Sequence, residues 1–299
     1  MKIVLLEDLK QSKEELNKTK EVFQKKGHDF KIESFDHIQT NDADIVIIGN
    51  HPFPKEMFSF FPELKLLAVA FTGLDHVDQD YAKEHGILIC NASGYATSSV
   101  TELTISAMIF LLRKFDQQIS CAKENKIGIL GNTLEGKTVG ILGLGKIGKQ
   151  VATICQMFGA NILYYQRRKE ENVPYAYESL ETLLKKSDLI SLHCPLTKET
   201  NHLLSEKEFS LMKKGVYLIN TARGGLLCQE DLKKALKEEK FAGVFLDVLE
   251  KDSYPSDLLS NSKVFITPHI GYYTKEAMKK RWEILLERIL EFIEKNTPY

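Results

Sequence analysis

The stretch from Lys137 to Arg168 reads KTVGILGLGKIGKQVATICQMFGANILYYQRR. It opens with an apolar, β-branched run over Thr138 to Leu142, which is typical of a buried parallel strand. Three glycines follow with the spacing G-x-G-x-x-G, then a segment with helical apolar spacing, then a second strand over Asn161 to Tyr165. This order makes a βαβ unit, and within such a unit the glycine spacing is the dinucleotide-binding fingerprint.

Each of the three glycines has a physical role in that fingerprint. Gly143 permits the tight turn, Gly145 lets the backbone approach a pyrophosphate, and Gly148 allows the helix to pack closely on the strand. The pyrophosphate would lie on the N–H groups that open the helix, at Lys146 and Ile147. The competing interpretation is a doubly wound domain whose glycines serve packing alone.

Composition limits the possible classes of protein. The chain has 299 residues, of which 43% are hydrophobic and 27% charged, and its net charge is −1 at pH 7. That length suffices for two domains with separate cores, and the balance is typical of globular proteins. A charge so close to zero predicts neither nucleic acid nor a membrane surface as a partner.

The sequence also bears on the compartment. Met1 to Leu6 holds too few consecutive apolar residues for a signal sequence, and the longest apolar run, Leu103 to Leu112, is far too short to span a membrane. The five cysteines are scattered and include no C-x-x-C pair, which favours reduced thiols. We therefore expect a cytoplasmic protein, and we predict no metal site.

Strand-like runs alternate with helical segments along the chain, which predicts parallel sheets covered on both faces. The expected fold class is α/β, with two doubly wound parallel-sheet domains. We expect a flavodoxin-like substrate domain over residues 1–96 plus 272–299. A Rossmann cofactor domain is expected over residues 97–271.

Two helices matter for this organisation. One is expected from about Val100 to Phe115, with Ser98 or Ser99 as its cap, and residues 116–135 after it are expected to be irregular. Because this helix is apolar on nearly every side, we expect it to be buried between domains or subunits. The other, Thr274 to Lys295, has amphipathic spacing and is expected to return to the first domain.

Three charged or titratable side chains follow strands of the expected cofactor domain: Arg223, Asp252 and His269. The carboxyl ends of parallel strands face the cofactor crevice. Hydride transfer between a nicotinamide and a carbonyl needs a group that moves a proton, which suits His269, and a cation that orients the substrate, which suits Arg223. Singly, each could be an ordinary surface or loop residue, but their places on successive strand ends favour catalysis.

A loop of the first domain offers a site for an anion. The residues FTGLDHVD, from Phe71 to Asp78, follow the carboxyl end of a buried strand. Gly73 would leave the N–H groups of Thr72, Gly73 and Leu74 accessible to a carboxylate. Taken alone, the loop could equally be a plain glycine turn.

Together these motifs resemble the D-isomer-specific 2-hydroxyacid dehydrogenases over nearly the whole chain. The matching segments, in order, are FTGLDHVD, VTELT, LEGKTVGILGLGKIG, SDLISLHCPLTKET, MKKGVYLINTARGGLL, GVFLDVLEKD and TPHIG. The resemblance implies a catalytic arginine, acid and histidine, and a substrate carboxylate bound by the amides of Thr72 to Leu74. It implies a homodimer and a further set of cofactor contacts: His193, Cys194, Pro195, Thr221, Ala222 and, at the nicotinamide carboxamide, Asp247.

The chain departs from the family pattern at the catalytic acid. That acid is normally a glutamate followed by proline, and the corresponding position here holds Asp252 followed by Ser253. Aspartate is one methylene shorter, so its hydrogen bond to His269 would be longer or would need a backbone shift. Glu250 lies two residues too early, and Asp252 is therefore the predicted acid.

A second departure bears on the cofactor. An acidic residue about 20 residues after the first glycine selects NAD by binding the ribose 2′-hydroxyl, whereas arginine accommodates the 2′-phosphate of NADP. The chain has Gln166 there, followed by Arg167 and Arg168. We therefore expect NADP(H) to be favoured over NAD(H). The alternative is that both arginines simply point into solvent.

The loop NASGYAT, from Asn91 to Thr97, is similar to that of the glycerate dehydrogenase and hydroxypyruvate reductase branch of the family. The expected reaction is the reduction of a small 2-oxo acid, such as glyoxylate or hydroxypyruvate, to the D-2-hydroxy acid, with His269 as the general acid/base. Two alternatives remain open. One is a dinucleotide-sensing protein such as the corepressors of this fold, and the other is a formate- or phosphite-type dehydrogenase.

Overall fold

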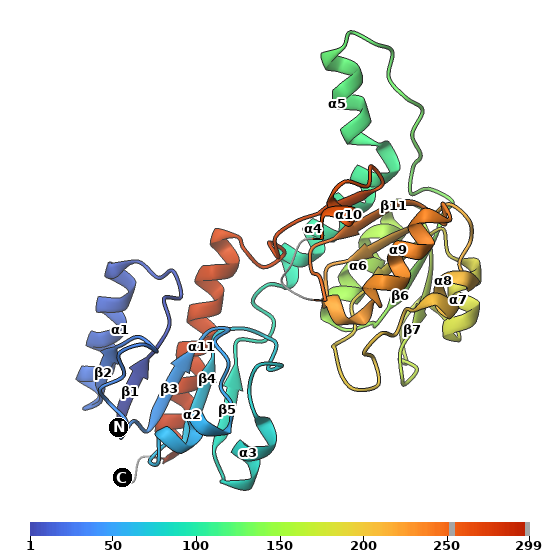
Figure 1. Cartoon of the computed structure of the whole chain (residues 1–299). Helices are drawn as coiled ribbons and strands as arrows, with labels where there is room; N and C mark the ends of the chain where they lie inside the picture. The colour runs from blue at the N-terminus through green and yellow to red at the C-terminus, as the bar shows by residue number, and fades with distance from the viewer. Residues whose placement is uncertain (251–254, 297–299) are drawn as a thin grey trace. The chain divides into compact units, whose positions relative to one another are not determined.

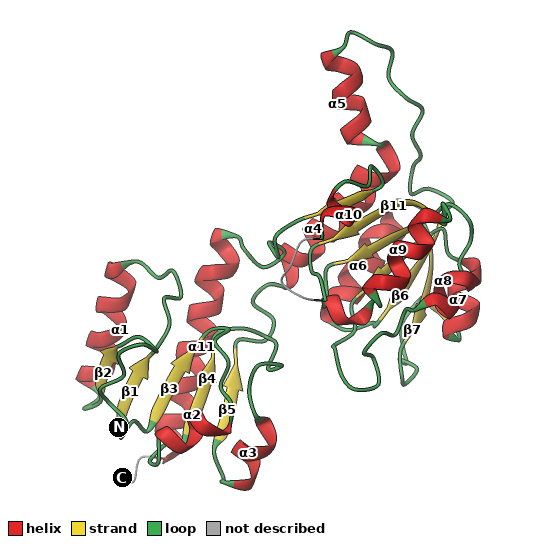
Figure 2. Cartoon of the chain, viewed as in Figure 1, coloured by secondary structure: helices red, strands yellow, loops and turns green. Residues whose placement is uncertain are grey.

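The computed structural model of the chain describes residues 1–250 and 255–296. It divides into two compact units (Figure 1). Unit 1 comprises Met1–Ala96 and Lys275–Tyr299, and unit 2 comprises Thr97–Thr274. Each unit is an α/β structure built on one parallel sheet, as the alternation of elements in the sequence predicts (Figure 2).

The sheet of unit 1 has the strand order β2-β1-β3-β4-β5, and every pairing is parallel. This order is that of the flavodoxin-like doubly wound fold. Its strands are β1 (Lys2–Leu5), β2 (Asp29–Ile32), β3 (Ile45–Ile48), β4 (Leu66–Val69) and β5 (Leu88–Asn91). Its helices are α1 (Lys13–Lys25), α2 (Lys55–Phe60), α3 (Gln79–Glu84) and α11 (Lys275–Asn296).

The C-terminal helix α11 supplies much of the core on one face of this sheet. Its buried residues Trp282, Leu285 and Ile289 share a cluster with Ile3 and Ile45 of the central strands. Side chains alternate along a strand, so the neighbouring residues of those strands enter a separate cluster on the opposite face. The prediction that the last helix returns to the first domain is confirmed.

The sheet of unit 2 has the order β12-β11-β10-β9-β6-β7-β8 and is also wholly parallel. Its strands are β6 (Thr138–Leu142), β7 (Asn161–Tyr165), β8 (Ala176–Tyr177), β9 (Leu189–Leu192), β10 (Val216–Asn220), β11 (Phe241–Leu246) and β12 (Val264–Ile266). Its helices are α4 (Thr97–Arg113), α5 (Phe115–Lys123), α6 (Lys146–Met157), α7 (Leu180–Lys186), α8 (Glu206–Leu211), η1 (Gly224–Leu226), α9 (Gln229–Lys237) and α10 (Ser256–Leu259). The strand order reverses between β6 and β9, and open α/β sheets bind ligands beyond the carboxyl ends of the strands at such a point.

The predicted cap of the first helix of unit 2 is wrong. Helix α4 begins at Thr97, so Ser98 and Ser99 lie in its first turn and do not cap it. Ser99 Oγ instead forms a hydrogen bond with Thr274 Oγ1 at 2.9 Å, and this partner is too distant in sequence to be foreseen.

The segment expected to be irregular after α4 contains helix α5. Lys114 adopts a left-handed backbone (φ +51°), which ends α4 and lets the chain begin a new helix. In Figure 1, α5 projects away from the sheet of unit 2. None of its residues is buried, so this helix contributes nothing to the core of unit 2.

In the described ranges, no helix is both long enough and apolar enough to cross a lipid bilayer.

Candidate active site

The glycine turn lies where the strand order of unit 2 reverses. Gly143 follows β6 with a left-handed backbone (φ +96°), and its N–H donates to the Tyr165 carbonyl oxygen at 2.8 Å. A Cβ at this position would lie 2.7 Å from Cys194 N and 2.8 Å from the His193 carbonyl carbon. Only glycine satisfies both the backbone angle and the close approach of the loop that follows β9.

The other two glycines differ in what surrounds them. A Cβ on Gly148 would lie 2.1 Å from the Gly143 carbonyl oxygen, so this glycine lets α6 pack on the turn. Gly145 is the N-cap of α6, and a Cβ there would meet no atom within 4 Å. No described side chain caps this helix, so the N–H groups from Lys146 and Ile147 onward are open to an anion. The cradle therefore fits a dinucleotide pyrophosphate.

The end of β7 lies against the same turn. Gln166 Oε1 accepts a hydrogen bond from the Leu144 N–H at 3.0 Å, and Gln166 is half-buried. Arg167 and Arg168 are exposed, and within the described ranges neither forms an ion pair. The three residues predicted to choose between the two dinucleotides thus border the glycine turn.

The loop after β9 carries His193, Cys194 and Pro195. The His193 Nε2 atom and the Ser191 hydroxyl lie 2.9 Å apart, and enclosure by protein lowers the pKa of His193 to about 3. Burial raises the pKa of the Cys194 thiol to about 11. At neutral pH both side chains are therefore uncharged.

The loop after β10 is braced by the last residue of that strand. Asn220 is fully buried; its Nδ2 donates to the Arg223 carbonyl oxygen at 2.9 Å and its Oδ1 accepts from the Ala222 N–H at 3.0 Å. The hydroxyls of Thr221 and Thr104 of α4 lie 2.8 Å apart. These contacts hold the turn from which the half-buried Arg223 side chain extends.

Asp247 follows β11, and it is the most heavily bonded polar group of this edge. Its side chain is 1% exposed. Its Oδ1 accepts from the Thr267 hydroxyl at 2.6 Å and from the Ile270 N–H at 2.8 Å, and its Oδ2 accepts from the Gly271 N–H at 2.8 Å. The carboxylate thus binds the loop that follows β12.

His269 lies in that loop and has an unusual backbone. Its φ is +54°, a left-handed conformation that costs a non-glycine residue about 1 kcal/mol. Its N–H donates to the carbonyl oxygens of Asp247 and Thr267, each at 2.9 Å. The imidazole is exposed and meets the Tyr272 ring edge to face, with 5.2 Å between centroids. The Asp247 contacts therefore hold the backbone of the loop that carries this exposed ring.

The structure brings Arg223, Asp247 and His269 to one edge of unit 2, because β10, β11 and β12 are adjacent and parallel. The predicted acid Asp252 lies outside the described residues. Glu250 is described, and its Oε1 lies 2.6 Å from His202 Nε2. That contact turns Glu250 to a partner other than His269.

The backbone next to Glu250 packs on the arginine loop. A Cβ on Gly224 would lie 1.9 Å from the Leu249 carbonyl carbon and oxygen, so only glycine allows this approach. The segment that leads into the predicted acid is thereby held beside Arg223.

The predicted anion loop belongs to unit 1. Among the described residues, nothing accepts a hydrogen bond from the backbone N–H groups of Thr72, Gly73 and Leu74. The Thr72 carbonyl oxygen accepts from Asn91 Nδ2 at 2.8 Å, and Asn91 Oδ1 accepts from Arg288 Nη1 at 3.1 Å. The loop is thus tied to β5 and α11, with its amides available to an anion.

Sequence reasoning missed the residues that brace these loops. Ser191, Asn220 and Thr267 each lie within or directly after an apolar strand, and each hydrogen-bonds a predicted site residue or its backbone. A polar residue within or at the carboxyl end of an apolar strand was the available signal, because a buried polar group requires a partner.

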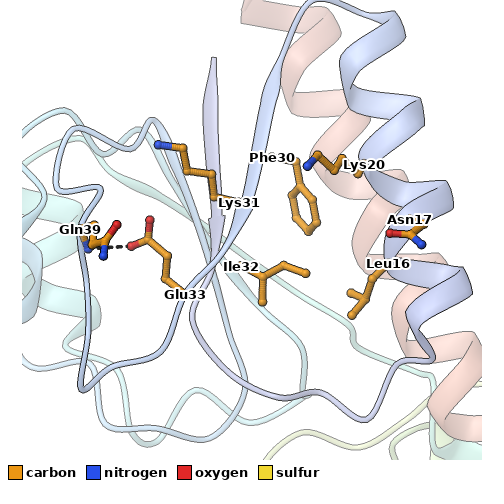
Figure 3. A pocket seen from close by; sticks show the side chains of 8 residues that line it. All are labelled: Leu16, Asn17, Lys20, Phe30, Lys31, Ile32, Glu33 and Gln39. Atoms are coloured by element: carbon orange, nitrogen blue, oxygen red, sulfur yellow. Dashed lines mark hydrogen bonds between the residues drawn. The ribbon is translucent and has the colours of Figure 1, made fainter.

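Figure 3 shows a hollow of unit 1 that other residues line. Its volume is about 440 Å³, and none of the predicted site residues lines it. Its lining consists of Leu16, Asn17, Lys20, Phe30, Lys31, Ile32, Glu33 and Gln39. Glu33 is already bonded to the N–H groups of Gln39 and Thr40, so this hollow adds nothing to the candidate site.

Comparison with known proteins gives consistent matches. Residues 105–271 match the family described as D-isomer specific 2-hydroxyacid dehydrogenase, NAD binding domain. The chain is 38% identical to a glyoxylate reductase of Thermococcus litoralis over 269 residues, which cover 85% of this chain and 81% of that protein. It is 34% identical to a hydroxypyruvate reductase of Blautia hydrogenotrophica, over 86% of this chain and 84% of that one.

Among solved structures, the chain is similar to an acyclic imino acid reductase in complex with NADPH and D-Arg. The TM-score is 0.88 and the identity 28%, and the match covers 99% of this chain and 98% of the other.

Two substitutions separate the packing role of the glycine turn from its binding role. In Gly148→Ala the new Cβ must displace a backbone carbonyl, so we expect the free energy of unfolding to fall by about 2–4 kcal/mol. In Gly145→Ala the Cβ enters open space, so stability should stay within about 1 kcal/mol while dinucleotide affinity falls. Urea denaturation and dinucleotide titration measure the two effects, and equal losses of stability would contradict this assignment.

Proposed function

We propose a reaction and a cofactor for this chain on one premise: it belongs to the D-isomer-specific 2-hydroxyacid dehydrogenases, which are NAD(P)-dependent oxidoreductases. The reaction is the NADPH-dependent reduction of a small 2-oxo acid, of the glyoxylate or hydroxypyruvate type, to the D-2-hydroxy acid. The observation that carries this proposal is that Arg223, Asp247 and His269 follow three adjacent parallel strands, β10, β11 and β12. Asp247 binds the loop that contains His269.

The chain's own residues take distinct roles in this reaction. His269 donates a proton to the carbonyl oxygen, because its ordinary pKa is near neutrality and its ring reaches solvent. Arg223 orients the carbonyl and carboxylate through its planar guanidinium. The amides of Thr72, Gly73 and Leu74 bind the carboxylate. The dinucleotide, when bound, supplies the hydride.

The preference for NADPH is proposed from the end of β7. Gln166 carries no charge, so it does not repel a 2′-phosphate. Arg167 and Arg168 are exposed beside it and can pair with that phosphate.

A screen of nicotinamide oxidation tests the reaction and the cofactor together. With glyoxylate, hydroxypyruvate, pyruvate and bulkier 2-oxo acids, we expect turnover of the small acids and a kcat/KM about tenfold higher with NADPH than with NADH. His269→Ala should lower kcat by about 10²–10⁴-fold and retain dinucleotide binding. Tight NADPH binding without turnover of any acid would favour a dinucleotide sensor. A clear NADH preference would refute the cofactor assignment.

The acid is assigned to Asp252, which follows Glu250 by two positions in the sequence. Asp252→Ala should lower kcat at neutral pH far more than Glu250→Ala, since Glu250 is engaged by His202. Without the acid, His269 should lose part of its protonated population, so the Asp252→Ala profile of kcat against pH should fall at a lower pH than that of the parent. The reverse ranking of the two variants would overturn the assignment.

We also propose that the chain works as a homodimer in the cytoplasm. Beyond α5 the chain exposes Ile127 and Leu130, at 94% and 90%. At the base of α5 lies a mainly apolar hollow of about 360 Å³, lined by Ile105, Ile109, Phe115 and Ile154 among others. In a two-fold dimer, the loop after α5 of one copy, with Ile127 and Leu130, would pack into the apolar hollow of the other copy. Both the loop and the hollow belong to unit 2. The five cysteines are free thiols, as a reducing compartment requires.

The dimer is tested by introducing negative charges into the loop after α5. The double substitution Ile127→Glu with Leu130→Glu should convert the protein to a monomer in sedimentation velocity, because it places charges in an apolar interface. Lys126→Glu adds negative charge to the same loop at a polar position, and it should leave the dimer intact. A monomeric parent protein, or a double variant that still dimerises, would contradict the proposal.

A further inference from the structure

The side chain of Gln166 has a definite orientation. The Leu144 N–H is a donor, so the atom facing it at 3.0 Å must be the amide oxygen. The amide nitrogen then points the other way, where it lies 3.5 Å from Glu170 Oε2. Gln166 therefore connects the glycine turn to a carboxylate four residues further along the chain.

Glu170 is held in place by its backbone as well as by its side chain. The hydroxyl of the buried Tyr164 accepts from the Glu170 N–H at 3.0 Å and donates to the Glu170 carbonyl oxygen at 3.1 Å. Tyr164 belongs to β7, so the position of Glu170 is set by the sheet. The carboxylate lies beside Gln166 at the surface, where 37% of the Glu170 side chain is exposed.

Lys149 of α6 completes this arrangement. Its Nζ lies 2.5 Å from Glu170 Oε1. The hydrogen bond and charge of Lys149 lower the pKa of Glu170, so this carboxylate is ionised at neutral pH. The cofactor edge of unit 2 thus contains a negative charge as well as the exposed Arg167 and Arg168.

We propose that Glu170 is a further determinant of nucleotide choice, and that it acts against the two arginines. Its carboxylate stands beside the residue that occupies the ribose-recognising position, where a negative charge disfavours a 2′-phosphate. Lys149 neutralises part of that charge, so the pair moderates the preference for NADPH without abolishing it. The inference rests on the proposed binding of a dinucleotide at the glycine turn, but it holds whichever dinucleotide the parent protein prefers.

The experiment compares nucleotide preference in three variants. Glu170→Gln should raise the ratio of kcat/KM for NADPH to that for NADH by about three- to tenfold over the parent, mainly through the KM for NADPH. Lys149→Met leaves Glu170 uncompensated and should lower the same ratio. Glu171→Gln removes an exposed neighbouring charge and serves as the matched control, with a ratio within about twofold of the parent.

A binding measurement that needs no turnover accompanies the kinetics. Calorimetric titration with adenosine 2′,5′-bisphosphate and with 5′-AMP isolates the contribution of the 2′-phosphate. Glu170→Gln should tighten binding of the bisphosphate and leave binding of 5′-AMP unchanged. A parent protein that prefers NADH refutes the cofactor assignment above and leaves this inference standing if the ratio still rises. If the ratio in Glu170→Gln matches that in Glu171→Gln, the inference is overturned.

Discussion

The buried carboxylate of Asp247 is the constraint on which the catalytic edge of unit 2 depends. Burying an ionised carboxylate is costly unless hydrogen bonds replace its lost hydration. Asp247 obtains those bonds from Thr267, Ile270 and Gly271, so the loop that carries His269 must fold around it. The backbone N–H of Asp247 also donates to the carbonyl oxygen of Asn220. One buried charge thereby couples the ends of β10, β11 and β12, and it sustains the left-handed backbone of His269.

Much of this architecture can be predicted from the sequence because local rules govern it. The spacing of three glycines specifies a strand, a tight turn and a helix, and the structure has all three around Gly143. The alternation of strands and helices likewise specifies two parallel sheets. Residues that follow strands must lie at the carboxyl edge of a parallel sheet, which explains why Arg223 and His269 could be chosen without coordinates.

The remainder depends on contacts between residues far apart in the sequence. The resemblance implies that Asp247 contacts the nicotinamide, yet no spacing rule shows that its oxygens bind a loop 20 to 24 residues away. Helix α5 buries none of its residues and begins after Lys114, whose left-handed backbone the sequence does not indicate. The fingerprint points to the position of Gln166 and not to Glu170; only the hydrogen bonds between the Tyr164 hydroxyl and the Glu170 backbone bring this later residue to the same place.

The two histidines near the cofactor edge of unit 2 differ in their exposure to solvent. His193 adjoins the glycine turn, but enclosure lowers its pKa to about 3, so it carries no transferable proton at neutral pH. A general acid must be reprotonated in every catalytic cycle, which requires access to water and an ordinary pKa. His269 has the exposed ring that this requires, on a backbone that Asp247 holds in place. The difference in solvation between the two loops therefore supports the proposal that His269 donates the proton.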